Sequence, residues 1–248
     1  MSARGRGNPQ LIFLHGYTTA WPKAPVWNRL LGEVGLAHVG VTVPVAPKGS
    51  GRRDPFNPRG LPSWFRYGTD HGSLLPQEFD APHAADLVDA VADTGALWRL
   101  MRQAVRAAGG AHRVALAGES QGGVVAAVLA MRWNAAHPDD QLGAVGLLRT
   151  AADPSTWVAG VPPRMRTRFH VVLGAADTTF RPTFSLHSLE PLLRANPATV
   201  DEVPSAYRHA SGNVHVEVLP DVGHGDSNRR VYRRYVQLLS ADWPSADG

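Results

Sequence analysis

The sequence predicts an α/β fold with a mostly parallel central sheet of about six or seven strands and helices on both faces. Three observations predict it. Short apolar runs recur along the chain, segments with helical periodicity separate them, and the runs are nearly continuous rather than alternating. Continuous apolar runs are typical of parallel strands covered on both sides, and alternation with helices is typical of parallel sheets.

The elements follow from these patterns. Strands are expected at 11–14, 39–45, 113–117, 144–148, 170–173 and 214–219. Helices are expected at 26–36, 84–108, 120–137, 185–194 and 229–239. The segment 84–108 carries one long apolar stripe at helical spacing, and 120–137 is so rich in alanine, valine and leucine that we expect a buried helix.

Two segments do not fit a minimal α/β unit. The segment 44–82 is rich in proline, glycine and aromatic residues without a sustained period, and we interpret it as a functional loop that walls a substrate site. The segment 196–212 is polar, and we interpret it as a surface insertion. With 248 residues, the chain has room for one sizeable core, so we expect a single domain over 1–248.

Composition excludes several classes of protein. Hydrophobic residues at 44% and charged residues at 19% exclude a disordered, collagen-like or coiled-coil chain. The absence of cysteine excludes disulfides, thiolate metal sites and a cysteine nucleophile. No apolar run approaches the roughly 20 residues of a membrane span. The N-terminal segment MSARGRGNPQ has no signal-peptide core, so we expect a cytoplasmic protein.

The charge balance gives little reason to expect a nucleic-acid partner. The formal net charge is +4, and nearly all basic residues are arginine. The best basic patch is RRVYRR, from Arg229 to Arg234, which we interpret as the solvated face of a helix. The sequence leaves open whether the chain is a monomer or a homodimer.

The sharpest local signal is GESQGG, from Gly118 to Gly123. It follows an apolar strand and opens the alanine-rich helix. A G-x-S-x-G turn in this context places Ser120 on a tight strand-to-helix corner, with small neighbours that let the strained backbone pass. The positive end of the following helix then lies beneath the serine. We therefore predict that Ser120 is a nucleophile.

A serine nucleophile needs a base, and the base needs a third group to hold its tautomer. In doubly wound hydrolases the chain order is serine, acid, histidine. Asp177 follows the strand that ends at Leu173, and His224 lies in a glycine-flanked loop after the last strand. All three residues come at the carboxyl ends of strands, where open α/β sheets build their sites. Asp177 and His224 are therefore the predicted acid and base.

Other residues fit these roles less well. Asp153 follows an earlier strand, and Asp221 and Asp226 are too close to the histidine in sequence to orient it. His209 and His215 precede or lie within a strand, so we interpret them as surface or packing residues.

Acyl transfer also requires donors for the oxyanion. The predicted donors are the backbone N–H groups of Gln121, which follows the nucleophile, and of Tyr17, in the loop after the first strand. His15, in the same loop, is expected to shape the loop rather than act as a base. Phosphate-binding, dinucleotide-binding and zinc motifs are absent from the sequence, so no cofactor or metal is expected.

Several segments together resemble the α/β-hydrolase superfamily, and within it the phospholipase/carboxylesterase branch that includes acyl-protein thioesterases. They are LIFLHGY, PSWF at Pro62 to Phe65, GESQGG, LGAAD and GHGDS. PSWF discriminates best, because that branch typically has such an element between its oxyanion loop and its nucleophile. The resemblance extends from about Leu11 to Leu239 and implies the same triad and the same donors.

The resemblance also implies that the stretch around Trp64 and Phe65 borders the acyl pocket. Other apolar candidates for this pocket are Tyr17, Trp21, Trp27 and Leu74, of which Trp27 is better interpreted as a core residue. The chain departs from the branch where a G-D-x-D segment usually precedes the acid, since Ala175 follows Gly174 here. The segment between acid and base is also longer than usual.

We therefore expect a serine hydrolase that cleaves carboxylic esters of small molecules through an acyl-enzyme intermediate. Two alternatives stay open. The same triad could serve an acyl thioesterase or a transacylase in a biosynthetic pathway, and a hydrolase fold without chemistry could serve as a binding module. The preferred leaving group would separate an ester hydrolase from a thioesterase or a transacylase, and the sequence does not show it.

Overall fold

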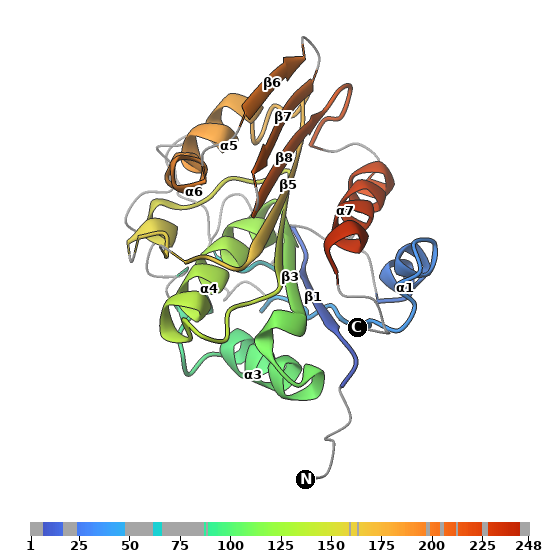
Figure 1. The fold of residues 1–248 in the computed structure, drawn as a ribbon, viewed down its shortest axis with the longest axis vertical. Coiled ribbons are helices and arrows are strands. Elements are labelled where there is room, and N and C mark those ends of the chain that lie inside the picture. Colours follow the sequence, from blue (N-terminus) through green and yellow to red (C-terminus); the bar gives the residue numbers. More distant parts are fainter. Residues whose placement is uncertain are drawn as a thin grey trace.

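The centre of the molecule is one eight-stranded sheet with the strand order β2-β1-β3-β4-β5-β8-β7-β6 (Figure 1). The computed structural model describes residues 7–16, 24–47, 62–65, 87, 89–158, 160–162, 164–196, 199–203, 206–211, 213–224 and 228–243. Strands β2 through β8 in that order are parallel, and β7 and β6 extend the sheet as an antiparallel pair. The mostly parallel sheet predicted from the sequence is confirmed.

Each parallel strand overlaps a predicted strand. The parallel strands are β1 Gln10–Leu14, β2 Gly40–Thr42, β3 Val114–Glu119, β4 Ala144–Leu148, β5 Arg168–Gly174 and β8 Val214–Leu219. All of β3 and β4 is buried, which explains the continuous apolar runs. The edge strand β2 is shorter than the expected 39–45 and ends before Pro44, a residue that cannot donate to a strand ladder.

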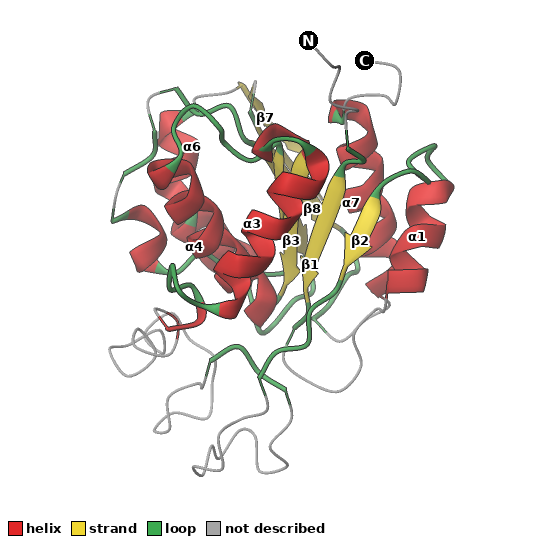
Figure 2. Ribbon diagram, turned by 90° about the horizontal axis from the view of Figure 1, so that it is seen from below, coloured by secondary structure: helices red, strands yellow, loops and turns green. Residues whose placement is uncertain are grey.

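Helices cover both faces of the sheet, as predicted (Figure 2). One face carries α1 Ala24–Gly32 and α7 Asn228–Asp242. The other carries α3 Ala96–Ala108, α4 Gln121–Ala136 and α6 Glu190–Ala195. Alternating side chains of β1 serve the two cores: Leu11 and Phe13 pack with the buried Trp27 of α1, while Ile12 and Leu14 pack in the core beneath α3 and α4. Trp27 is thus a core residue.

The predicted helix at 84–108 is wrong as one continuous element. Leu87 and residues 89–90 are helical, the chain turns over 91–95, and α3 begins only at Ala96. The turn contains Asp93, Thr94 and Gly95, which are poor helix formers and favour turns and helix starts. The apolar stripe therefore spans two helical segments.

The predicted helix at 185–194 is also divided. It forms α5 Pro182–Ser188 and α6 Glu190–Ala195, with Leu189 between them at φ −93° and ψ 0°. Pro191 lies in the first turn of α6, where its missing N–H is tolerated. Inside a continuous helix the same proline would remove a hydrogen bond and clash with the preceding turn.

The segment 196–212, interpreted as a surface insertion, contains two strands of the sheet. These are β6 Thr199–Val203 and β7 Ala206–Ser211, and β7 pairs with β8. Antiparallel strands at a sheet edge need no continuous apolar run, so the polar composition concealed them. Of the segment 44–82, the structure describes only 44–47 and 62–65, and the predicted role of the rest lies outside the described residues.

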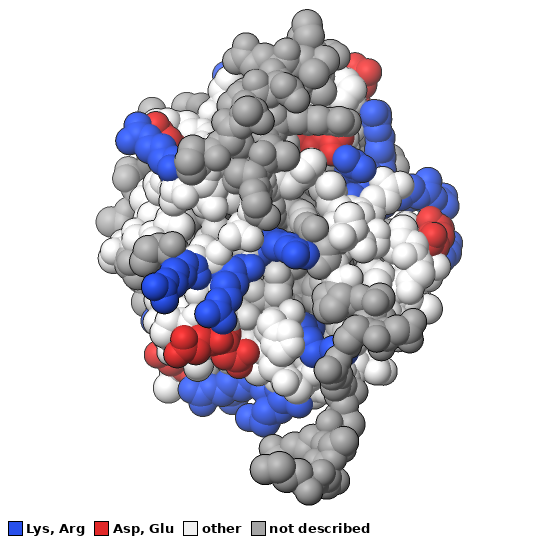
Figure 3. Space-filling model, viewed as in Figure 1, with Lys and Arg blue, Asp and Glu red and all other residues white. Residues whose placement is uncertain are grey.

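The arginine run Arg229–Arg234 lies on α7, and its valine and tyrosine are buried. Arg233 pairs with Glu33 at 3.1 Å, and Arg234 pairs with Glu217 at 2.6 Å. On the face seen in Figure 3, the described basic and acidic side chains are interspersed rather than gathered into one positive field. None of the helices in the described ranges is long and apolar enough to cross a membrane.

Candidate active site

Ser120 lies on the strand-to-helix corner that the sequence predicts, between the end of β3 and the start of α4. Its backbone has φ 51° and ψ −123°, a conformation that costs free energy for a residue with a side chain. The corner leaves no room for a side chain two residues before or two residues after the serine, where the chain has Gly118 and Gly122. A Cβ atom on Gly118 would lie 2.1 Å from the Gly122 carbonyl oxygen, and one on Gly122 would lie 2.2 Å from that of Leu14.

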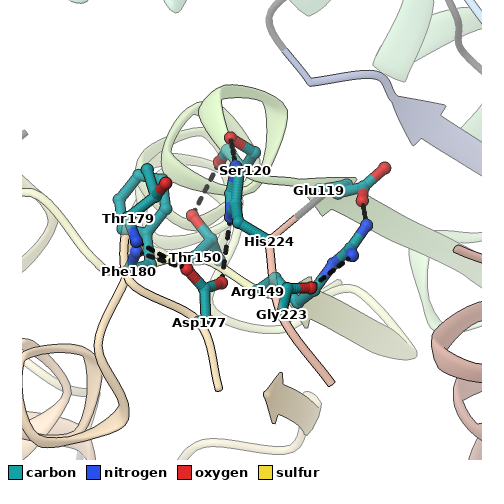
Figure 4. A network of polar contacts seen from close by, with 9 residues as sticks. All are labelled: Glu119, Ser120, Arg149, Thr150, Asp177, Thr179, Phe180, Gly223 and His224. Atoms are coloured by element: carbon teal, nitrogen blue, oxygen red, sulfur yellow. Dashed lines mark hydrogen bonds and ion pairs between the residues drawn. The ribbon is translucent and has the colours of Figure 1, made fainter. Parts of the chain in front are cut away.

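The structure brings Ser120, His224 and Asp177 into one chain of hydrogen bonds (Figure 4). Ser120 Oγ and His224 Nε2 are 3.0 Å apart, and His224 Nδ1 lies 2.9 Å from Asp177 Oδ2. The serine follows β3, the aspartate follows β5 and the histidine follows β8, so three strand ends of one sheet edge supply the three groups. With Nδ1 donating to the carboxylate, Nε2 is the hydrogen-bond acceptor that faces the Ser120 hydroxyl.

The Asp177 carboxylate is fully buried and held from two directions. Its Oδ1 atom accepts hydrogen bonds from the backbone N–H groups of Thr179 and Phe180, both at 2.8 Å, while Oδ2 faces the histidine. The Phe180 ring lies 5.5 Å from the His224 ring, centroid to centroid. Backbone donors on one oxygen and imidazole on the other fix the orientation of the carboxylate.

The other candidates for the acid and the base that can be placed make different contacts. Asp153 lies at the start of a short 3₁₀ helix, Pro154–Trp157, and its Oδ1 accepts from the Ser155 N–H at 2.8 Å. His215 is in β8 and lies 3.6 Å from Glu217. The side chain of His209 and the whole of Asp226 lie outside the described residues.

One predicted oxyanion donor can be placed. Gln121 is the first residue of α4, so its N–H has no carbonyl one turn earlier in the helix to bind. A Cβ atom on Gly16, in the loop after β1, would lie 3.2 Å from Ser120 Cβ, which puts this loop beside the serine. Tyr17 itself lies outside the described residues, and its N–H remains a prediction.

His15 holds this loop through both of its ring nitrogens, as expected from the sequence. Its Nε2 accepts from the Ala46 N–H at 3.0 Å, so its Nδ1 carries the proton and donates to the Gly16 carbonyl at 2.7 Å. Both ring nitrogens of the neutral imidazole are thus hydrogen-bonded to backbone groups. Burial lowers the pKa of His15 below its usual 6.5, although the bond to Gly16 opposes this.

The side chain of Gln121 joins the PSWF segment to the strand-to-helix corner at Ser120 by two hydrogen bonds. Its Oε1 accepts from the Trp64 N–H at 2.8 Å, and its Nε2 donates to the Phe65 carbonyl at 2.6 Å. Trp64 Nε1 also donates to the His15 carbonyl at 2.7 Å. Trp64 and Phe65 are therefore buried beside the corner, whereas Trp21 and Leu74, the other predicted pocket residues, lie outside the described residues.

We expect the free energy of unfolding to decrease as the pH falls, because His15 becomes protonated more readily in the unfolded chain. Because burial lowers its pKa in the folded state, the unfolded chain binds a proton more readily. The contribution of His15 to the free energy of unfolding is fully present above its pKa in the unfolded chain, near 6.5. It is lost as the pH falls from there through the lower pKa of the folded state. Denaturant unfolding from pH 8 down to pH 5 measures this loss.

The matched variant is His15→Gln, whose side-chain oxygen can accept from Ala46 but does not titrate. Its free energy of unfolding should fall less steeply over the same pH range than that of the wild type. Identical slopes in the two proteins would contradict the role of His15.

Three polar residues near Ser120, His224 and Asp177 could not be singled out from the sequence. Glu119 precedes Ser120, and Arg149 and Thr150 follow β4 (Figure 4). The Thr150 hydroxyl donates to the Ser120 carbonyl at 2.7 Å, and Arg149 pairs with Glu119. The sequence signal that could have indicated Arg149 and Thr150 is their place directly after the fully apolar strand β4. Among the described residues, no group of three or more histidine, aspartate or glutamate side chains could hold a metal ion.

Comparisons with known proteins rest on structure rather than sequence. No family model matches the chain, and no curated protein matches its sequence. Solved structures do match. The chain has the α/β-hydrolase fold, and its structure is similar over nearly its full length to phospholipase/carboxylesterase and acyl-protein thioesterase structures.

Three of these structures illustrate the likeness. Esterase PE8 has 16% identity and a TM-score of 0.63, covering 96% of this chain and 94% of its own. Acyl-protein thioesterase 2 of Zea mays has 15% identity and a TM-score of 0.63, with 98% and 97% covered. The Bacillus cereus carboxylesterase has 16% identity and a TM-score of 0.57, with 93% and 88% covered. At this identity the likeness shows the fold.

Proposed function

We propose that this protein is a serine hydrolase that cleaves carboxylic esters through an acyl-enzyme intermediate. The observation that carries the proposal is the hydrogen-bond chain from Ser120 through His224 to Asp177 at the carboxyl edge of the sheet. In this arrangement the serine hydroxyl faces one ring nitrogen of the histidine, and the aspartate carboxylate faces the other. The fold shared with an esterase and with carboxylesterases supports the same class of reaction.

In the proposed reaction, Ser120 Oγ attacks the acyl carbon while His224 Nε2 takes the serine proton. The buried Asp177 carboxylate stabilises the resulting imidazolium through Nδ1. When the tetrahedral intermediate collapses, the bond to the leaving oxygen breaks and His224 gives its proton to the departing alcohol. A water molecule then attacks the acyl-serine, His224 takes its proton, and the acid leaves as Ser120 regains a proton.

The negative oxygen of each tetrahedral intermediate needs fixed donors. We assign this role to the N–H groups of Gln121 and Tyr17. Gln121 is supported by its place at the amino end of α4, where the helix dipole also favours negative charge. Tyr17 is supported by Gly16, its neighbour in sequence, which lies against Ser120.

For the substrate, we propose an acyl group of short to medium length in a pocket lined by Trp21, Trp64, Phe65 and Leu74. The hydrogen bonds that hold Trp64 and Phe65 beside the nucleophile support this assignment. Large aromatic rings close to the nucleophile limit the room for a long acyl chain.

The experiment that tests the proposed function is hydrolysis of p-nitrophenyl esters of graded acyl length, from acetate to palmitate, together with the matched thioesters. We expect turnover with an optimum at short to medium acyl groups. A fluorophosphonate should stop turnover at one label per chain, and mass spectrometry should find that label on the peptide that contains Ser120.

The alternatives predict other outcomes. Turnover of thioesters alone would favour an acyl thioesterase, and transfer to an added alcohol in preference to water would favour a transacylase. A protein that hydrolyses no ester or thioester and takes up no fluorophosphonate would contradict the proposed function and favour a binding module. An acyl profile that rises steadily toward palmitate would contradict the proposed pocket.

A further inference from the structure

A buried polar network lies beside the triad, and Arg149 is its centre (Figure 4). The guanidinium group of Arg149 donates through one nitrogen to the Glu119 carboxylate and through the other to the Gly223 carbonyl oxygen, at 3.0 Å. The second carboxylate oxygen of Glu119 accepts from the Tyr232 hydroxyl of α7. Arg149 and Glu119 are both almost fully buried.

The contacts of Arg149 fall on residues that adjoin the triad in sequence. Glu119 immediately precedes Ser120, and Gly223 immediately precedes His224. These two segments come from strands β3 and β8, which are separated in the sheet by β4 and β5. A single planar guanidinium therefore spans the distance between the nucleophile segment and the base segment.

The backbone at Arg149 also indicates a special position. In the described part of the chain, the non-glycine residues with positive φ are Ser120, Arg149 and Asp221, and Arg149 has φ 45°. Such backbone persists only where surrounding contacts hold it, and it is concentrated at functional sites. The Arg149 N–H donates to the Val172 carbonyl at 2.8 Å, which ties the residue to β5 near its carboxyl end as well.

Burying an ion pair is a poor way to gain stability. Two charges lose their hydration, and an apolar pair of the same volume is often as stable or more stable. What a buried pair with directed hydrogen bonds supplies is a defined geometry. The Arg149–Glu119 pair is placed where geometry matters most, since the serine and histidine must meet within hydrogen-bond distance.

We propose that Arg149 is a positioning residue that sets the distance between Ser120 and His224 by holding Glu119 and Gly223 together. This role rests on the proposed function, since it acts through the triad. The planar fork of arginine suits the task because its nitrogens reach two acceptors in fixed directions. A lysine ammonium at the same position could reach either acceptor but would hold neither in a fixed direction.

The first test removes the charges in balance, with the double variant Arg149→Met/Glu119→Gln. No charge is left unpaired in the core, so the fold should survive. We expect kcat for p-nitrophenyl butyrate to fall by about a hundredfold with KM nearly unchanged, because a shift of the triad affects the reaction more than substrate binding. The rate of Ser120 phosphonylation by a small fluorophosphonate should fall in parallel.

The matched control is Arg234→Met/Glu217→Gln. This pair joins β8 to α7, at 2.6 Å, and neither of its residues adjoins Ser120 or His224 in the sequence. Its kcat and phosphonylation rate should stay near those of the wild type even if its melting temperature falls as far as that of the first variant. A loss common to both variants would indicate general loosening of the fold and would overturn the positioning role.

A second variant, Arg149→Lys, keeps the charge beside Glu119 and decides the question if the double variant does not fold. We expect kcat to fall by about tenfold or more, with KM retained, because the ammonium lacks the fork. Full activity of Arg149→Lys would overturn the proposal. A wild type that reacts with neither ester nor fluorophosphonate would instead contradict the proposed function, and the positioning role would fall with it.

Discussion

Replacing Ser120 by alanine is expected to lower kcat for p-nitrophenyl butyrate by about a millionfold, to a residual rate that fixed donors alone can supply. The alanine lacks the oxygen that attacks the acyl carbon, while the fold loses one side-chain contact to His224. Steady-state hydrolysis measures the loss, and thermal unfolding should show a melting temperature close to that of the wild type.

The matched control is Ser240→Ala on α7, whose hydroxyl donates to the Gln237 carbonyl at 2.8 Å far along the helix from the triad. Its kcat should equal that of the wild type. Comparable hydrolysis by Ser120→Ala and the wild type would assign the turnover to another group and would remove the basis of the mechanism.

The meeting of Ser120, His224 and Asp177 could be predicted because each of them follows an apolar strand. Parallel strands bring their carboxyl ends to one edge, so residues far apart in sequence are placed together once the strand order is assumed. The flanking small residues of Ser120 and the glycine-flanked loop of His224 then mark which strand ends matter. The order serine, acid, histidine along the chain points to Asp177 as the acid, and its hydrogen bond to His224 agrees with that prediction.

The network of Glu119, Arg149 and Tyr232 beside these residues could not be predicted in the same way. Glu119, Arg149 and Tyr232 come from three separate elements, and no local pattern says that their side chains meet. A lone arginine after a strand is most simply interpreted as a solvated side chain, whereas this one is almost fully buried. Its pairing depends on the relative placement of β3, β4 and α7, which periodicity does not determine.

The errors in secondary structure have related causes. The apolar spacing of 84–108 predicts one helix because it persists across the turn at 91–95, although the residues there favour a break. The strands β6 and β7 were missed because edge strands can be polar, and here the partner strand β8 supplies the pairing. In the first case local turn residues outweigh the apolar spacing, and in the second the pairing with β8 outweighs the polar composition.

Replacing Asp177 by asparagine tests a finer feature, the tautomer of His224. The Oδ1 position must remain an acceptor because the Thr179 and Phe180 N–H groups point at it. The asparagine would therefore turn its NH₂ group toward His224 Nδ1, which must then accept a hydrogen bond and leave the proton on Nε2. An Nε2 that already carries a proton cannot take the one from Ser120.

We expect kcat of Asp177→Asn to fall by about ten-thousandfold while the structure changes little. Asp153→Asn is the matched control, because an asparagine oxygen can still accept from the Ser155 N–H at the start of the 3₁₀ helix. It should keep wild-type kcat. The reverse result, with Asp153→Asn inactive and Asp177→Asn active, would transfer the role of the acid to the rival aspartate. Both carboxylates follow parallel strands of the same sheet, but Asp177 is hydrogen-bonded to His224 whereas Asp153 accepts from the Ser155 N–H. The two variants measure the consequence of that difference.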